Sequence, residues 1–131
     1  MANANEDTVR TGYEAFSKGD MDTLRSIMSP DVVHSVPGNN QMTGDYKGID
    51  NVLGYYGKLF ELTGGNFSAE LKSVKAEGDN LVIAQHNNKG EREGRKLDND
   101  TTLDFTFNDE GKIVRLDEKP QDQAAEDAFW G

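Results

Sequence analysis

Apolar residues recur at helical spacing in two segments near the start of the chain. The first segment, residues 6–18, carries its apolar positions on one face: Val9, Gly12, Tyr13 and Phe16. The second begins after Asp20, a good N-cap, and its apolar side consists of Met21, Leu24, Ile27 and Met28. Ser29-Pro30 ends it, because the residue before a proline avoids helical backbone angles. Two helices are therefore predicted before residue 31.

A β-branched segment comes next and predicts a strand that carries His34. Pro37-Gly38 ends this strand, and a polar loop leads to Gly48. Residues 49–63 predict a long amphipathic helix with the apolar face Ile49, Val52, Leu53, Tyr56, Leu59 and Phe60. His34 is thus expected between a strand and an apolar helix, an arrangement that can furnish a small-molecule pocket.

From residue 67 the apolar period changes to two, which predicts antiparallel strands joined by short turns. Strands are expected over residues 67–76, 81–88, 97–107 and 113–118. Residues 89–95 are interpreted as a solvated connection. This order predicts an α+β domain in which three N-terminal helices pack on a curved, mainly antiparallel sheet.

The last segment, residues 121–131, is interpreted as a tail that ends in Phe129-Trp130. Adjacent aromatic side chains are seldom left in water at a free end. We therefore expect the tail to dock on the body of the protein or on a partner subunit. The 131 residues suit a single domain spanning positions 1–131.

Composition narrows the possible partners. The net charge of −10 disfavours nucleic acid and anionic membranes, which bind basic surfaces. The absence of cysteine excludes a disulfide framework, cysteine-based metal sites and a cysteine nucleophile. No secretory signal or membrane-spanning run is visible, so a cytoplasmic location is expected.

Four segments share their order and spacing with a known family. They are Tyr13-Glu-Ala-Phe-Ser-Lys-Gly-Asp20, Pro30-Asp-Val-Val-His34 with Pro37-Gly38, Tyr46-Lys-Gly-Ile-Asp-Asn-Val52 and Asp109-Glu-Gly-Lys-Ile113. With them the chain resembles the SnoaL-like group of the nuclear transport factor two superfamily, which also contains ketosteroid isomerase, scytalone dehydratase and limonene epoxide hydrolase. The resemblance implies a cone-shaped domain, an apolar pocket inside the cone, and a homodimer through the outer face of the sheet.

The resemblance leaves the reaction open, because the superfamily includes isomerases, dehydratases, cyclases, hydrolases and proteins without catalytic activity. The catalytic set of ketosteroid isomerase is not reproduced. Gly12 falls near its oxyanion-binding tyrosine, Ser35 or Val36 near its base, and Leu103 near its second oxyanion acid. The Arg-Asp-Asp pattern of limonene epoxide hydrolase is not evident either. SnoaL-like cyclases place an acid/base aspartate near the end of the last strand, and the resemblance offers Asp122 or Glu118 for that role.

His34 is the first candidate for acid/base chemistry, because histidine titrates near neutral pH. Asp122 or Asp45 is the expected partner carboxylate, since each lies where the chain leaves a regular element, and an apolar cavity raises a carboxyl pKa. The residues expected to bind substrate are Tyr13, Tyr56, Phe60, His86, Asn99, Phe105 and Trp130. Most have a structural alternative: core packing for the aromatics, a turn or tail position for the aspartates, a backbone hydrogen bond for His34 and a dimer interface for His86.

The two histidines lack the spacing of a metal site, so no metal centre is expected. The sequence has no phosphate-binding or dinucleotide-binding loop, so no cofactor is expected either. These features favour a cofactor-independent enzyme that isomerises, dehydrates or cyclises a small, largely apolar molecule by proton transfer. The alternative is a non-catalytic small-molecule-binding or dimerisation module of the same fold. A cavity packed shut by Phe60, Phe105 and Tyr56 favours that alternative, and an open one with His34 near a carboxylate favours the enzyme.

Overall fold

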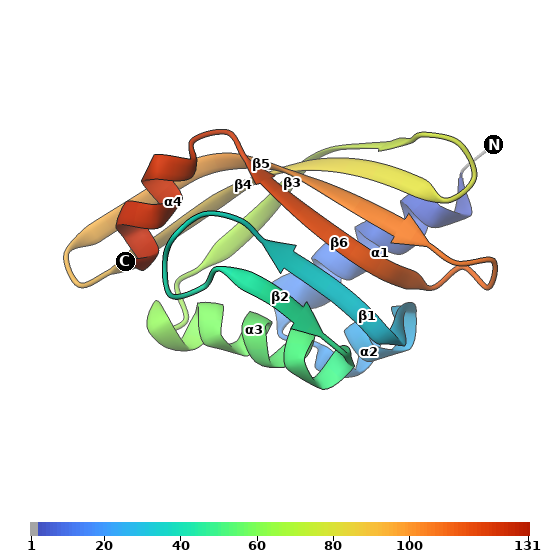
Figure 1. Ribbon diagram of the computed structural model, residues 1–131, viewed down its shortest axis with the longest axis horizontal. Helices are drawn as coiled ribbons and strands as arrows, with labels where there is room; N and C mark the ends of the chain where they lie inside the picture. Colours follow the sequence, from blue (N-terminus) through green and yellow to red (C-terminus); the bar gives the residue numbers. More distant parts are fainter. Residues whose placement is uncertain (1–2) are drawn as a thin grey trace.

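The computed structural model describes residues 3–131, and this part of the chain forms four helices and six strands (Figure 1). In chain order they are α1 (Ala4–Lys18), α2 (Met21–Ile27), β1 (Met28–Val36), β2 (Gly44–Lys47), α3 (Ile49–Leu62), β3 (Ser68–Ala76), β4 (Leu81–Arg92), β5 (Arg95–Phe107), β6 (Ile113–Pro120) and α4 (Gln123–Trp130).

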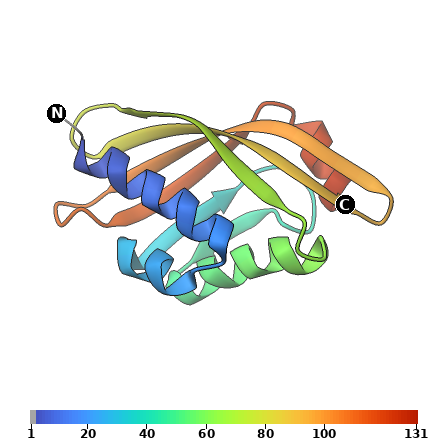
Figure 2. The same ribbon diagram turned by 180° about the vertical axis from the view of Figure 1, so that it is seen from behind.

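The strands form one sheet in the order β2-β1-β6-β5-β4-β3. All neighbouring strands run antiparallel except β1 and β6, which are parallel. Helices α1, α2 and α3 lie on one side of this curved sheet (Figures 1 and 2). The predicted α+β class and the mainly antiparallel sheet are confirmed.

Side-chain caps and glycine fix the ends of the first two helices. The Asn3 side chain accepts hydrogen bonds from the first amides of α1, and Gly19 ends that helix in the left-handed region at φ 68°. Asp20 caps α2. Pro30 has no amide hydrogen to donate. It lies in the part of β1 that β2 does not reach, because β2 pairs only with residues 33–36, so no hydrogen bond to β2 is lost.

Two segments predicted as loops belong to the sheet. Gly44–Lys47, expected as part of a polar loop, is the edge strand β2. Residues 89–95, expected as a solvated connection, extend β4 and β5, so that only Glu93 and Gly94 form the turn, both at positive φ. Such a turn suits the twist of a hairpin. Because the outward side chains of these strands are exposed, their charged sequence gave no strand signal.

The prediction of three helices is wrong by one, because residues 123–130 form α4 after the sheet. Asp122 caps this helix by accepting a hydrogen bond from the amide of Ala125. Phe129 and Trp130 are buried within this chain, and the Trp130 ring lies 5.8 Å from that of Phe67. The tail therefore docks on the body of the same chain, against β5 and β6.

The core fills the space between the sheet and α1, α2 and α3. Its contributors from the sheet alternate with outward-facing residues, for example Val82 and Ala84 on β4 and Leu103 and Phe105 on β5. From α3 come five buried side chains: Val52, Leu53, Tyr55, Tyr56 and Leu59. None of the helices within residues 3–131 has the length and apolar character needed to cross a membrane.

Candidate active site

A hollow remains between the helices and the inner side of the sheet. Its volume is about 680 Å³, including the space at its open mouth. The walls are mainly apolar and aromatic, with Phe16, Leu24, Leu59, Phe67, Phe105 and Leu116 among them.

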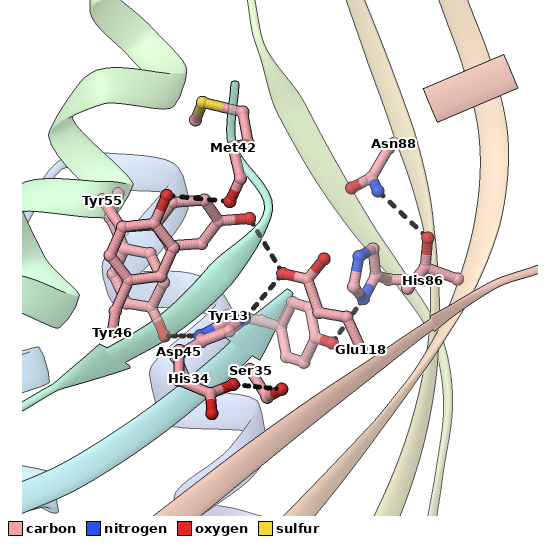
Figure 3. Close-up of polar contacts among 12 residues, drawn as sticks. Tyr13, His34, Ser35, Met42, Asp45, Tyr46, Tyr55, His86, Asn88 and Glu118 are labelled. Carbon is pink, nitrogen blue, oxygen red and sulfur yellow. Dashed lines mark hydrogen bonds and ion pairs between the residues drawn. The ribbon is translucent and has the colours of Figure 1, made fainter. Parts of the chain in front are cut away.

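An acid–base pair of a buried histidine and a largely covered glutamate forms where β1 and β6 lie side by side. His34 is opposite Leu116 in the register of these strands, and its Nε2 lies 2.6 Å from Oε1 of Glu118 (Figure 3). The other ring nitrogen, Nδ1, lies 2.9 Å from the Tyr56 hydroxyl. Tyr55 donates a hydrogen bond of 3.0 Å to the same Oε1 of Glu118. Strand β1 and helix α3 thus each supply one partner to the same carboxylate oxygen of Glu118 on β6.

The second oxygen of Glu118 remains open. Among residues 3–131, no side chain or backbone amide donates to Oε2, whereas both ring nitrogens of His34 are engaged. Because the glutamate lines the hollow, Oε2 is the acceptor of this pair that a bound molecule can reach. Glu118, rather than His34, therefore offers direct contact.

The surroundings keep Glu118 ionised. Burial has the largest effect and raises its pKa, but the charge and hydrogen bond of His34, together with the hydrogen bond from Tyr55, outweigh it, so the pKa of Glu118 lies below its ordinary value. Burial also raises the pKa of Tyr55 and of Tyr56 well above 10. Both phenols keep their protons at neutral pH and remain hydrogen-bond donors.

A second polar pair, Tyr13 and His86, also lines the hollow. The Tyr13 hydroxyl on α1 is 2.6 Å from Nδ1 of His86 on β4 (Figure 3). Burial lowers the pKa of His86, although the negative charge of Glu118 partly opposes this, so the ring is neutral at neutral pH. Burial also raises the pKa of Tyr13. The pair therefore presents an uncharged phenol to the hollow.

A third polar group, Glu126, reaches the hollow from α4. It is buried, with 7% of its surface exposed, and the Asn99 amide donates a hydrogen bond of 2.8 Å to its Oε2. Helical spacing could have indicated it, because Glu126, Phe129 and Trp130 share one side of a helix that Asp122 caps. Within the described chain, no three His, Asp or Glu side chains gather as a metal ion would require.

Most residues predicted to bind substrate line the hollow. They are Tyr13, Tyr56, His86, Phe105 and Trp130, together with His34 from the predicted acid/base set. Phe60 instead packs against Phe16 and Phe67, behind the wall. Asn99 acts on Glu126 rather than lining the hollow itself. The roles of these residues in binding stay predictions.

The expected positions of Asp45 and Asp122 beside the pocket are wrong. Asp45 is exposed on β2 and accepts a hydrogen bond from Ser35. Its neighbour Tyr46 points inward and stacks on Tyr55, so alternation along the strand turns Asp45 outward. Asp122 is exposed because it caps α4. Glu118, the other residue that the resemblance offered, occupies the hollow.

Tyr55 was missed because the helical pattern assigned only Tyr56 to the apolar face of α3. Both tyrosines are buried, at 5% exposure each. The buried face of α3 is therefore wider than the apolar face that the helical pattern predicted. Tyrosine is suited to such a position, because its ring packs while its hydroxyl reaches a polar partner.

Residues 9–116 match the family model of the SnoaL-like domain. The chain is 34% identical over 127 residues to an uncharacterized protein of Mycobacterium tuberculosis (strain H37Rv), covering 97% of this chain and 96% of that relative. Among solved structures, Bal32a from a soil-derived mobile gene cassette is 36% identical with a TM-score of 0.96, and the likeness covers 99% of this chain and 98% of Bal32a.

A protein of unknown function with a cystatin-like fold from Xanthomonas campestris is also similar. It is 34% identical with a TM-score of 0.89, covering 97% of this chain and 98% of the Xanthomonas protein. The family match spans well over half of the sequence and agrees with the resemblance that the sequence motifs suggested. The chain therefore belongs to the SnoaL-like domain family.

Proposed function

We propose that the protein is a cofactor-independent enzyme that moves a proton within a small, largely apolar molecule held in the hollow. The observation that supports this most is Glu118: a carboxylate only 15% exposed, in a side chain that lines an aromatic cavity, with one oxygen fixed by His34 and Tyr55 and the other without a hydrogen-bond donor among residues 3–131. Isomerisation, dehydration and cyclisation all begin with such a proton transfer at carbon.

In this proposal Glu118 accepts the proton at Oε2, and His34 positions it. The ionised form is available at neutral pH because its pKa is lowered. The Tyr56 hydroxyl can donate to Nδ1 of His34 or accept from it. The imidazole therefore keeps both hydrogen bonds whether it is neutral or protonated, and it can balance the charge of Glu118 throughout a reaction.

Tyr13 is the candidate partner for an oxygen atom of the substrate. Removing a proton next to a carbonyl group places negative charge on the carbonyl oxygen, and a fixed donor lowers the energy of that state. In this role His86 carries its proton on Nδ1 and donates to the Tyr13 oxygen, so that the hydroxyl proton of Tyr13, which the phenol keeps at neutral pH, is available to the bound molecule in the hollow. The substrate is then held between a base on β6 and a donor on α1.

The compound 5-nitro-1,2-benzisoxazole tests the base without knowledge of the natural substrate. A base in an apolar cavity removes its C3 proton, the N–O bond breaks, and a coloured nitrophenolate forms. We expect Glu118→Gln to slow this reaction by about 100-fold, the lower end of what a positioned base contributes. Asp45→Asn, which changes an exposed carboxylate outside the hollow, is the matched control and leaves the rate unchanged. A wild-type rate no faster than that of the Glu118 variant contradicts the proposal.

Binding is measured separately from turnover. Trp130 is the only tryptophan of the chain and lines the hollow, so quenching of its fluorescence by the nitro compound reports occupancy. We expect Glu118→Gln to bind the compound and to convert it about 100-fold more slowly than the wild-type protein. Binding by the wild-type protein without conversion indicates a non-catalytic binding module instead.

A further inference from the structure

Glu118 shares its surroundings with a second carboxyl group, that of Glu126. A smaller cavity adjoins the main hollow, and four residues line both spaces: Tyr55, Glu118, Glu126 and Trp130. Glu126 comes from α4, whereas Glu118 comes from β6. Two carboxyl groups on different elements thus lie on the wall that the cavities share.

The partners of the two glutamates differ in kind. Glu118 has the imidazole of His34, which can carry a positive charge. Glu126 has uncharged partners, the amide of Asn99 and the indole of Trp130, and forms no ion pair with any of residues 3–131. A buried carboxylate without a cation is costly, whereas a protonated carboxyl is not. The two sites therefore favour opposite protonation states.

Asn99 also determines where a proton on Glu126 lies. Its side-chain nitrogen donates to the Asp122 carbonyl at 3.0 Å and to Oε2 of Glu126 at 2.8 Å. Both N–H groups are thereby used, and the amide cannot turn to accept a hydrogen bond from Oε2 without losing these contacts. The carboxyl proton is accordingly placed on Oε1.

The electrostatic surroundings of Glu126 agree with this geometry. Burial has the largest effect and raises the pKa of Glu126; hydrogen bonds from Asn99 and Trp130 oppose it, and the charges of Glu118 and Asp127 add to the rise. The cations near α4, Arg92 and Arg95, bind backbone carbonyls at the end of the helix and not this carboxyl. Tyr55 on α3 and the Asp122 cap are the other titratable groups nearby, and neither supplies a positive charge.

We propose that Glu126 is the acid that works with Glu118: it donates its proton to an oxygen of the bound molecule while Glu118 removes a proton from carbon. This rests on the proposed function of Glu118. The pair suits an elimination, in which oxygen leaves from the atom next to the carbon that loses its proton. In a β-hydroxy ketone the C–H and C–O bonds break, a C=C bond forms, and water leaves with the proton of Glu126. Solvent then returns both carboxyls to their starting states.

An uncharged substrate follows from the same arrangement. One glutamate is already ionised, and the rest of the wall supplies phenols, neutral imidazole and apolar groups. An anionic substrate would add a like charge to a space with little solvent, which is unfavourable. The substrate class is therefore a neutral β-hydroxy carbonyl compound or a close analogue.

Two benzisoxazoles that differ in leaving group test the acid. The nitrophenolate leaves easily without a proton, whereas the phenolate of unsubstituted 1,2-benzisoxazole is more basic and gains from one. We expect Glu126→Gln to slow the unsubstituted compound by about 100-fold and the nitro compound by less than about 3-fold. Asp122→Asn is the matched control, because asparagine also caps helices, and it changes neither rate.

The outcomes separate the two proposals. Equal slowing of both compounds by Glu126→Gln, or no slowing of either, overturns the role of Glu126, while a retained effect of Glu118→Gln leaves the proposed base in place. Loss of the Glu118 effect overturns both. Carboxyl ¹³C NMR of the wild-type protein gives an independent readout: the Glu126 signal, assigned by its loss in the variant, titrates at higher pH than that of Glu118. Titration of Glu126 at or below the pH of Glu118 also overturns the inference.

Discussion

Glu118 and Glu126 are the same amino acid in one hollow, and their neighbours alone separate their chemistry. His34 and Tyr55 stabilise the charge of the first, while the second has a neutral amide partner and no cation among the described residues. Environments that displace two carboxyl pKa values in opposite directions provide a base and an acid at the same pH. The division of labour proposed for the site depends on these few contacts.

Tyr55→Phe tests the contact that fixes Glu118. The hydrogen bond from Tyr55 is one of the effects that lower the pKa of Glu118, so its removal raises that pKa. The acid limb of the pH–rate profile for 5-nitro-1,2-benzisoxazole is expected to move to higher pH. Tyr46→Phe is the control, since Tyr46 stacks on Tyr55 but donates to the Met42 carbonyl. Identical acid limbs in both variants contradict the assigned role of Tyr55.

The residues of the site were predicted from the sequence where strand alternation or helical period applied. His34, His86 and Phe105 face inward on strands, and Tyr13 and Tyr56 on helices, as their patterns indicated. The partner carboxylate Glu118 was offered only by the family resemblance, beside Asp122, and not by the strand pattern. The final strand was ended near Glu118, so its inward register, shared with Leu116, was not used to choose between Glu118 and Asp122.

At the scale of elements, α4 contributes Glu126 and Trp130 to the wall of the hollow. It is held on one side by the loop after β1, where Gln41 donates to the Trp130 carbonyl and Asn40 to Asp127. On the other side the β4–β5 hairpin supplies Arg92 and Arg95. These contacts fix the helix that carries Glu126, so its orientation depends on loops at both of its flanks.

Arg92→Ala tests this attachment. Arg92 donates a hydrogen bond of 2.8 Å to the Phe129 carbonyl at the end of α4, and its side chain is 7% exposed. We expect a loss of about 1–3 kcal/mol in the free energy of unfolding, the usual range when a buried hydrogen bond loses one partner. Amide hydrogen exchange in residues 123–130 is expected to accelerate. Lys96→Ala, an exposed site in the same hairpin, is the control. Unchanged exchange in both variants contradicts the attachment.

The long periodic elements were predicted and the short ones were not. Helices α1 and α3 and strands β3 to β6 each span enough residues for a period to show. Gly44–Lys47 has too few residues for alternation to be visible. It forms a strand because it pairs with residues 33–36 of β1. Helix α4 depends on the Asp122 cap and on burial of its aromatics. Tertiary contacts, rather than local pattern, specify these two.

For the molecule as a whole, the two glutamates contribute to stability with opposite pH dependence. The folded pKa of Glu118 is lowered, so its contribution is present above the unfolded pKa and is lost as the pH falls through the folded pKa. The folded pKa of Glu126 is raised, so stability is lost as the pH rises from the unfolded pKa through the folded one.

Denaturant unfolding at about pH 4 and about pH 7 measures this difference. Glu126→Gln is expected to stabilise the protein relative to wild type, and more so at the higher pH, because the variant has no buried carboxyl to ionise. Glu118→Gln is expected to destabilise it, again more at the higher pH. A Glu126 variant whose stability relative to wild type does not change with pH contradicts the assigned protonation state.

The homodimer stays a prediction. The outer face of the sheet, through which the family resemblance places it, carries opposed carboxylates such as Asp104 and Asp117, each paired with a cation on its own sheet. The net charge of −10 disfavours close approach of two copies at low ionic strength. An association through this face would strengthen with added salt, which sedimentation equilibrium measures.

Proton transfer to Glu118 inside the hollow is tested most directly by a kinetic isotope effect. The rates for 5-nitro-1,2-benzisoxazole carrying hydrogen or deuterium at C3 are compared in the wild-type protein and in Glu118→Gln. We predict that deuterium slows the wild-type reaction markedly and that the variant reacts about 100-fold more slowly than the wild-type protein. Equal rates for the two isotopic forms, or an undiminished rate in the variant, would contradict the assignment of Glu118 as the base.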